Sequence, residues 1–183
     1  EDRVEDLREV MAWCAGQRIG YRIVPREDLQ RLSASQHHEG VCMAVLPLPV
    51  PRLASWLASL PPGPALALWL DGVGNPHNLG AILRSAAHFG VAGVLLPGGS
   101  GLSLSGAAAR TAEGGAEVVP LVDGGSASTA FASMRSAGFV PMATVVRGGD
   151  DLYRTELPER LLLVMGAEGE GVDAHVAAAC ERR

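Results

Sequence analysis

The sequence predicts an α/β protein in which helices cover both faces of a parallel β-sheet. From residue 65 onward, short apolar runs alternate with amphipathic runs, which is the pattern of repeated strand–helix units. Glycine or proline separates most of these runs, and the chain contains 23 Gly and 12 Pro. Because 48% of the residues are hydrophobic and 19% are charged, the chain can bury a substantial core.

Residues 65–183 carry the strand–helix pattern and are assigned to one domain. Apolar runs predict strands at residues 65–70, 93–97, 117–122, 139–146 and 161–165. Helices are predicted between and after them, at residues 78–89, 105–112, 127–137 and 173–179. The helix at 78–89 is the clearest, because Leu79, Ile82, Leu83 and Ala86 recur at three- and four-residue steps.

Residues 1–46 predict a smaller α/β segment. A helix is expected over residues 3–15, a second one begins after Pro25, and strands are expected at 21–24 and 41–46. A segment of this size buries too little surface to be stable alone. Six prolines fall within residues 47–64, which are therefore predicted to form a semi-rigid linker.

The basic residues exclude several enzyme classes. All 15 are Arg, and the chain contains no Lys. A phosphate loop of the Gly-Lys-Ser/Thr type, a Schiff-base enzyme and a kinase with a phosphate-binding Lys all require that side chain. Cys14, Cys42 and Cys180 are too far apart for a zinc knuckle or a disulfide framework. The adjacent His37 and His38 are poorly spaced for joint ligation, so no metal site is expected.

Charge and hydropathy limit the partners. A net charge of −5 argues against bulk attraction to nucleic acid, although a local Arg patch remains compatible with RNA binding. The longest apolar runs are far shorter than the roughly 20 residues of a membrane span. Residues 1–6 are charged from the start and do not resemble a signal peptide. We expect a soluble cytoplasmic protein with no membrane partner.

Three glycine-rich loops follow predicted strands, at residues 71–80, 96–101 and 166–171. Ligands of open parallel sheets bind beyond the carboxyl ends of the strands, and glycine allows close approach of the backbone. The spacing of Gly72, Gly74 and Gly80 does not match the dinucleotide-binding fingerprint. Ordinary turn formation is the alternative explanation of these glycines.

Three polar residues stand out near these loops. Asn78 is placed to cap the predicted helix at 78–89, and Arg84 lies off its apolar stripe. A solvated surface Arg is the simpler interpretation of Arg84 taken alone. Glu168 lies among small residues after a buried strand, where a carboxylate would accept from backbone donors or pair with an Arg.

Two segments resemble signatures of the SpoU (TrmH) family of RNA methyltransferases. Residues 75–90, Asn-Pro-His-Asn-Leu-Gly-Ala-Ile-Leu-Arg-Ser-Ala-Ala-His-Phe-Gly, resemble the first signature. Residues 162–171, Leu-Leu-Val-Met-Gly-Ala-Glu-Gly-Glu-Gly, resemble the second. The resemblance extends from residue 66 to about residue 180, and residues 109–117 occupy the place of a helix and turn in such proteins.

The resemblance implies a SPOUT α/β knot, usually a homodimer, that binds S-adenosyl-L-methionine. It implies methyl transfer to a ribose 2'-hydroxyl of tRNA or rRNA. Residues 1–46, with Gln36 to Val41, resemble the later half of the small RNA-binding domain that often precedes the methyltransferase domain.

Residue roles follow from the same resemblance. Arg84, Asn78 and Glu168 are the implied catalytic residues, with Arg84 acting on the 2'-hydroxyl or an RNA phosphate and the other two orienting it and the loops. The implied cofactor-binding residues are Met165, Gly166, Ala167, Gly169, Gly171 and Thr144.

One family feature is missing from the sequence. The third signature, a strand, a Ser-Leu-Asn-containing loop and a final helix, is expected after Cys180, but the sequence ends at Arg183. The 65–183 domain is therefore expected to lack the segment that completes the knot, much of the cofactor pocket and part of the dimer interface. The alternatives are a catalytically inactive RNA-binding protein of the same fold, an unrelated α/β enzyme for a small nucleotide, and base methylation by a SPOUT protein.

Overall fold

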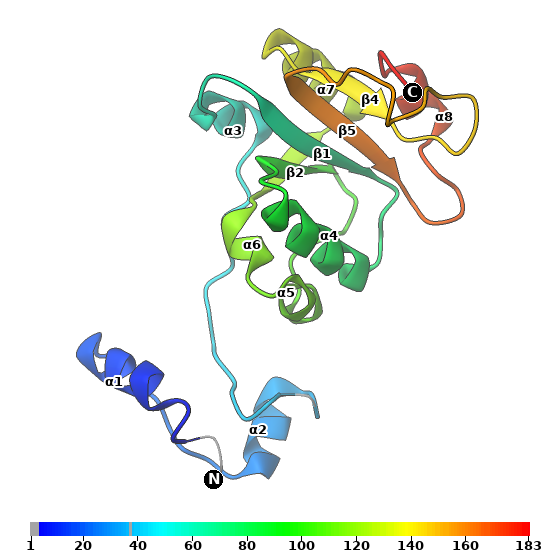
Figure 1. Cartoon of the computed structure of the whole chain (residues 1–183). Helices are drawn as coiled ribbons and strands as arrows, with labels where there is room; N and C mark the ends of the chain where they lie inside the picture. The colour runs from blue at the N-terminus through cyan, green and yellow to red at the C-terminus, as the bar shows by residue number, and fades with distance from the viewer. Residues whose placement is uncertain (1–3, 37) are drawn as a thin grey trace. The chain divides into compact units, whose positions relative to one another are not determined.

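The computed structural model describes residues 4–36 and 38–183 and divides the chain into two compact units (Figure 1). The first unit is Glu1–Pro47 and the second is Leu48–Arg183.

The second unit is built on a sheet of five parallel strands in the order β3-β2-β1-β5-β4. The strands are β1 (Ala65–Asp71), β2 (Gly93–Pro97), β3 (Leu121–Gly125), β4 (Val140–Ala143) and β5 (Arg160–Gly166). All carboxyl ends therefore lie at one edge of the sheet. The predicted parallel sheet is confirmed, and its centre is the apolar run of β1.

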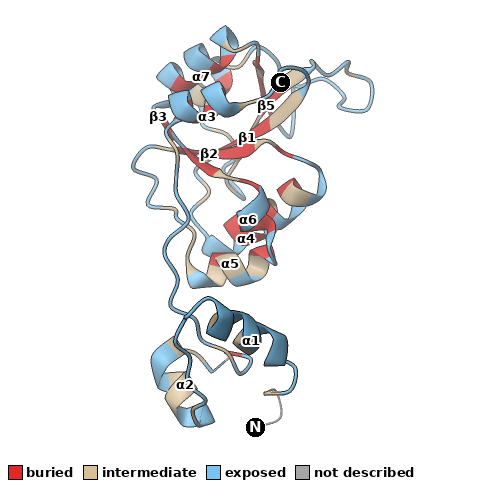
Figure 2. Ribbon diagram, turned by 90° about the vertical axis from the view of Figure 1, so that its left-hand side faces the viewer, coloured by how far each residue is buried: buried red, intermediate tan, exposed pale blue. Residues whose placement is uncertain are grey.

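Helices pack on both faces of this sheet, as predicted. Helices α3 (Leu53–Ser59), α7 (Ala127–Ser136) and α8 (Ala174–Ala178) pack on one face. Helices α4 (Pro76–His88), α5 (Gly106–Ala112) and α6 (Gly115–Val118) pack on the other. Each face of the sheet has its own hydrophobic core, and successive residues of β1 point into the two cores alternately. Ala67 and Trp69 face α3 and α7, and Leu68 and Leu70 face α4 and α5. Figure 2 shows buried residues along the strands and on the inner sides of the helices.

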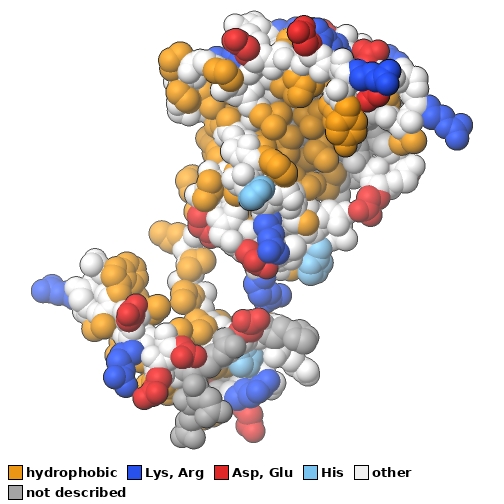
Figure 3. All heavy atoms as spheres, viewed as in Figure 1, with side chains coloured by type: hydrophobic (Ala, Val, Ile, Leu, Met, Phe, Trp, Pro, Cys, Tyr) orange, Lys and Arg blue, Asp and Glu red, His pale blue; other side chains and the backbone are white. Residues whose placement is uncertain are grey.

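Strands β5 and β4 have no helix over them on the α4 side of the sheet, within the part of the chain that the structure describes. The strand register places Leu163 beside Leu68, and Met165 beside Leu70, on this side. Leu66, Leu163 and Met165 are half-buried, and Figure 3 shows hydrophobic side chains gathered over β1 and β5. This apolar area is unusual, because parallel sheets are normally covered on both faces.

The predicted linker is partly folded into the second unit. Leu53 and Trp56 of α3 are 8% and 4% exposed and belong to the core beneath the sheet. The indole Nε1 of Trp56 also donates to the carbonyl oxygen of Ala92 at 3.2 Å. Pro51 and Pro61 flank this short helix. Its position on the sheet is set by the apolar side chains of Leu53 and Trp56.

One predicted strand of the second unit is shifted along the sequence, and another is shorter than expected. The strand expected at 117–122 spans Leu121–Gly125 instead, because residues 115–118 form α6. The strand expected at 139–146 ends at Ala143. Both runs are β-prone, but only the residues that pair with a neighbouring strand form part of the sheet.

The first unit contains two helices, α1 (Arg8–Gly16) and α2 (Arg26–Ser33), near their predicted positions. The strands predicted at 21–24 and 41–46 are wrong, because these residues form no strand in the structure. Their apolar side chains are exposed: Tyr21 is 52%, Ile23 67% and Val45 78% accessible. Extended backbone forms a strand only when an adjacent strand pairs with it, and none among the described residues does so here.

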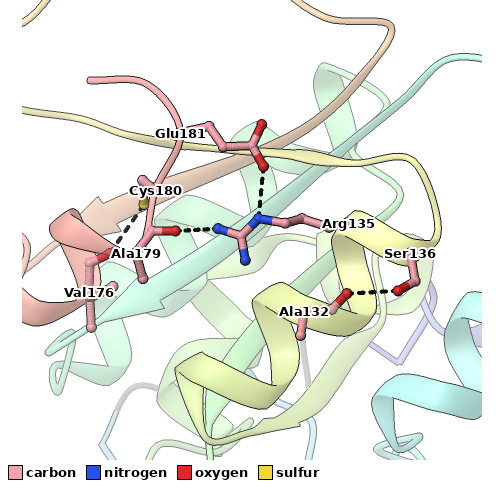
Figure 4. Close-up of polar contacts among 7 residues, drawn as sticks. All are labelled: Ala132, Arg135, Ser136, Val176, Ala179, Cys180 and Glu181. Atoms are coloured by element: carbon pink, nitrogen blue, oxygen red, sulfur yellow. Dashed lines mark hydrogen bonds and ion pairs between the residues drawn. The ribbon is translucent and has the colours of Figure 1, made fainter.

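The C-terminal residues run along the outer edge of β4. The amide of Glu181 donates to the carbonyl of Pro141 at 2.9 Å, and the amide of Ala143 donates to Arg182 at 3.0 Å. Arg135 of α7 fixes this segment, since its Nε donates to a carboxylate oxygen of Glu181 at 2.7 Å (Figure 4). The same guanidinium donates to the carbonyl of Ala179.

Candidate active site at the carboxyl edge of the sheet

Two of the three glycine-rich loops meet where β1 and β5 end. Asp71 and Gly166 are register partners at the ends of these adjacent strands. The Asp71 carboxylate accepts a hydrogen bond of 2.7 Å from the amide of Asp173, just beyond the second loop. A Cβ on Gly72 would lie 3.4 Å from the Cβ of Ala167, so the loops are in van der Waals contact range. The topology thus brings both signature segments to one place.

The loop after β5 is a tight turn that depends on glycine. The amide of Gly171 donates to the carbonyl of Ala167 at 2.9 Å and closes the turn. A Cβ on Gly166 would lie 1.9 Å from the carbonyl carbon of Gly171, which no side chain can accommodate. Gly169 and Gly171 have φ of 90° and 75°, in the region that favours glycine. On their outer side nothing lies within 4 Å of an added Cβ, so a ligand can approach this backbone closely.

Thr144 connects the end of β4 to the same edge. Its amide and its hydroxyl both donate to the carbonyl of Val164, at 2.9 and 3.1 Å. Val164 directly precedes Met165 in β5, so Thr144 lies beside the start of the predicted cofactor loop. The residues predicted to bind the cofactor therefore all come from the carboxyl ends of the neighbouring strands β4 and β5.

The N-cap of helix α4 lies three residues earlier than predicted. Asn75 caps the helix, with its side-chain oxygen accepting from the amide of His77 at 2.9 Å, and Pro76 is the first helical residue. The prediction that Asn78 is the cap is wrong. Asn78 is the third residue of the helix and is half-buried, and its side chain makes no hydrogen bond with the residues that the structure describes.

Arg84 projects from the outer side of α4 and forms an ion pair that the sequence did not reveal. Its Nη1 donates to a carboxylate oxygen of Glu113 at 2.8 Å, and both side chains are 60% exposed. Glu168 is exposed in the loop after β5 and forms no ion pair or hydrogen bond with other described residues. The predicted orientation of Arg84 by Asn78 and Glu168 is not observed; Glu113 is its partner.

Two close backbone contacts fix the position of Glu113 relative to Arg84. A Cβ on Gly80 would lie 2.5 Å from the carbonyl oxygen of Ala108, so α4 and α5 touch through glycine. A Cβ on Gly115 would lie 2.6 Å from the carbonyl oxygen of Leu83 and 2.9 Å from the Cα of Arg84. The turn that carries Glu113 is thus pressed against the backbone of Arg84. The Gly114-Gly115 pair is the one sequence signal that marks this turn.

The described part of the chain shows neither a metal cluster nor a membrane-spanning helix. Within residues 4–36 and 38–183, no group of three or more His, Cys, Asp or Glu side chains is arranged to hold a metal ion. No helix in these ranges has the length and apolar character needed to cross a bilayer.

Comparison with known proteins identifies the family. The profile of the SpoU rRNA methylase family matches residues 65–183, which is most of the chain. The chain belongs to this family. A second profile, for the substrate-binding domain of RNA 2'-O ribose methyltransferases, matches residues 1–51. The two SpoU signatures are therefore those that form the edge of the sheet described above.

Relatives of this SpoU chain include RNA methyltransferases. It is 37% identical over 166 residues to YfiF, an uncharacterized tRNA/rRNA methyltransferase of Escherichia coli O157:H7, covering 91% of the chain and 48% of YfiF. It is 32% identical to RlmB of Ralstonia nicotianae, a 23S rRNA (guanosine-2'-O-)-methyltransferase, covering 91% of the chain and 68% of RlmB. The chain thus spans about half to two thirds of these relatives' length.

A solved structure supports the fold. The AdoMet-bound rRNA methyltransferase of Sinorhizobium meliloti superposes with a TM-score of 0.64 at 24% identity, over 73% of this chain and 50% of that one. The similarity confirms the arrangement of the parallel sheet and its helices.

Proposed function

We propose that this SpoU chain is part of an enzyme that transfers the methyl group of S-adenosyl-L-methionine to a ribose 2'-hydroxyl of tRNA or rRNA. The observation that carries the proposal is the meeting of both signature segments at the carboxyl edge of β1 and β5. Ligands of open parallel sheets bind at this edge. The guanosine-2'-O specificity of RlmB favours ribose methylation over base methylation.

The loop after β5 fits a bound S-adenosyl-L-methionine. Gly169 and Gly171 expose backbone on a side free of neighbouring atoms, and Met165 and Ala167 add half-buried apolar surface beside it. We assign cofactor binding to Met165, Gly166, Ala167, Gly169, Gly171 and Thr144. The bound cofactor would supply an electrophilic sulfonium methyl group, so the protein has to align the hydroxyl and assist loss of its proton.

Arg84 is the residue assigned to the RNA. A guanidinium is a permanent cation in proteins, so Arg84 is assigned the role of a charged donor and not that of a base. A charged fork of N–H donors instead binds phosphate well and stabilises a developing oxyanion at the hydroxyl. Asn78 and Glu168 are kept as candidate catalytic residues from the family resemblance, because they lie in the two signature segments that meet at this edge of the sheet.

We further propose that the enzyme is a homodimer that acts in the cytoplasm. Support for the dimer comes from the apolar area over β1 and β5, where Leu66, Leu163 and Met165 remain half-buried. A second copy of the chain packed on this area would bury it. The first unit is assigned to RNA binding, because residues 1–51 match the substrate-binding profile.

The test compares methyl transfer with cofactor binding in the full chain. The Arg84→Ala variant is expected to lose methyl transfer to RNA by at least about a hundredfold, as removal of one stabilising donor does in other enzymes. Calorimetric titration with S-adenosylhomocysteine is expected to give an unchanged affinity, because Arg84 lies on α4 and outside the cofactor loop. Arg154→Ala removes an equal charge from another exposed site and serves as the control.

Two results would count against the proposal. Near-normal turnover by Arg84→Ala would remove Arg84 from the catalytic assignment. Failure of the wild-type full-length protein to bind S-adenosylhomocysteine while it still binds RNA would favour the catalytically inactive RNA-binding protein.

A further inference from the structure

The ion pair between Arg84 and Glu113 is placed where it contributes little to folding. Both side chains are 60% exposed, and one contact of 2.8 Å joins Nη1 to one carboxylate oxygen. Exposed pairs of this kind contribute little to the stability of a protein, because water screens the two charges. The pair is therefore easily broken. Its small contribution to folding does not explain why the two side chains lie together.

The backbone nevertheless places Glu113 with precision. Glu113 is the C-cap of α5 and has a φ of 46°, a left-handed conformation that is unfavourable for a residue with a Cβ. Gly114 and Gly115 follow, and Gly115 contacts the backbone at Leu83 and Arg84. Glycine or asparagine would suit the position of Glu113 better on conformational grounds. The carboxylate thus occupies a costly position directly beside Arg84.

The geometry also leaves Arg84 able to exchange its partner. A guanidinium has five N–H donors, and the contact with Glu113 uses Nη1. A phosphate group carries several acceptor oxygens and can form the bidentate contact that a single carboxylate oxygen does not form here. An RNA phosphate is therefore a stronger partner for Arg84 than Glu113 is in this arrangement.

We propose that Glu113 is a positioning residue that holds the Arg84 guanidinium in the free protein and competes with an RNA phosphate for it. RNA binding then replaces the Glu113 contact with a phosphate contact, and the carboxylate discourages anions too weak to displace it. This inference rests on the proposed function, in which Arg84 binds RNA.

The experiment is a mutant cycle measured by RNA binding. The full chain is titrated against a fluorescein-labelled RNA hairpin at about 100 mM NaCl, because electrostatic affinities depend on salt. The proteins are wild type, Glu113→Gln, Arg84→Ala, the double variant, and Glu117→Gln as control. Glu117 is exposed four residues further on and forms no ion pair with other described residues, so its variant removes the same charge without touching Arg84.

Glu113→Gln is expected to bind the hairpin about two- to fivefold more tightly than wild type, which corresponds to removing a competitor of surface ion-pair strength. The gain is expected to vanish in the Arg84→Ala background and to be absent or clearly smaller in Glu117→Gln. Unchanged thermal unfolding of Glu113→Gln would show that the variant is folded.

Three outcomes would overturn the inference. Weaker or unchanged binding by Glu113→Gln would show that Glu113 does not compete for Arg84. An equal gain from Glu117→Gln would indicate a general charge effect, and a gain that persists without Arg84 would place the effect elsewhere. The Arg84→Ala protein alone tests the proposed function, since its unchanged RNA affinity would show that Arg84 does not contact RNA.

Discussion

At the scale of single residues, Gly166 determines the shape of the cofactor loop. It ends β5, pairs in register with Asp71 of β1, and packs its Cα against the backbone of Gly171 and Val172. The tight turn from Ala167 to Gly171 exists because these backbones approach so closely. A methyl group at residue 166 would have to push the turn away from the sheet.

Gly166→Ala is therefore expected to weaken binding of S-adenosylhomocysteine by at least about tenfold, and to destabilise the fold by roughly 1–3 kcal/mol through overpacking. Calorimetric titration and urea unfolding measure the two effects. Gly74→Ala is the matched control, because an added Cβ on Gly74 meets nothing within 4 Å. If Gly166→Ala and Gly74→Ala bound alike, the loop would not be the binding element.

Cys180 is the residue whose titration the structure changes most clearly. Burial raises the pKa of its thiol from 9.0 to about 11, against a smaller opposing effect of Arg135. The thiol donates to the carbonyl of Val176 at 3.3 Å, which only the protonated form can do. Since the pKa is higher in the folded state, the stabilisation is complete below about pH 9 and is lost as the pH rises toward 11.

Alkylation with iodoacetamide at about pH 8 is expected to modify the exposed Cys42 at least about ten times faster than Cys180, because the thiolate is the reactive form. Mass spectrometry of the tryptic peptides measures both rates. Unfolding in urea should bring the two rates close together. Equal rates in the folded protein would contradict the burial of the Cys180 thiol.

At the scale of elements, the sequence predicted correctly the strands that are buried in the sheet and paired along their length. The strands at β1, β2 and β5 are short apolar runs buried in the sheet, and their predicted limits agree with the structure to within one residue. A strand was also predicted at 117–122, but its first residues belong to α6, a helical turn that begins at Gly115 and packs against α4. The order of apolar and polar residues within this run does not predict a contact with α4, which lies far away in the sequence.

The candidate site shows the same division. The glycine-rich loops at 71–80 and 166–171 were predicted to share an edge, because carboxyl ends of parallel strands do so, and they meet there. Glu113 was not predicted, because its role follows from α4 and α5 packing through Gly80. No sequence spacing connects residues 84 and 113.

Arg135 shows how one side chain fixes an element. Its contacts with Glu181 and Ala179 hold the C-terminal residues beside β4. Arg135→Ala is expected to cost about 1 kcal/mol in the free energy of unfolding and to speed hydrogen exchange at the amide of Ala143, which donates to Arg182. Arg154→Ala removes a longer and more exposed ion pair of 3.6 Å, and should stay within about 0.5 kcal/mol of wild type. Similar losses from both variants would show that the Arg135 contacts do not secure this segment.

At the scale of the whole molecule, the folded unit and the family profile begin at different residues. The SpoU profile starts at residue 65, whereas the compact unit starts at Leu48 and includes α3. The difference matters energetically, since Leu53 and Trp56 fill the core under β1 and β2. Replacing a buried Trp by Ala typically costs about 3–5 kcal/mol, which is a large part of the 5–15 kcal/mol that stabilises an ordinary domain.

A chain of residues 48–183 is therefore expected to unfold cooperatively with a Tm close to that of the second unit in the full chain. A chain of residues 65–183 lacks both side chains and the Trp56 hydrogen bond to Ala92, and is expected to show no cooperative transition. Circular dichroism during heating distinguishes the two.

Within residues 48–183, Trp56→Ala should lower the free energy of unfolding by about 3–5 kcal/mol, while Ser55→Ala on the exposed side of α3 should leave it nearly unchanged. If residues 65–183 melted like residues 48–183, α3 would not contribute to stability and the folded domain would begin at β1. Loss of the transition only in the shorter chain would place the start of the SpoU domain before residue 65, where the family profile begins, because the sheet requires α3 to close its core.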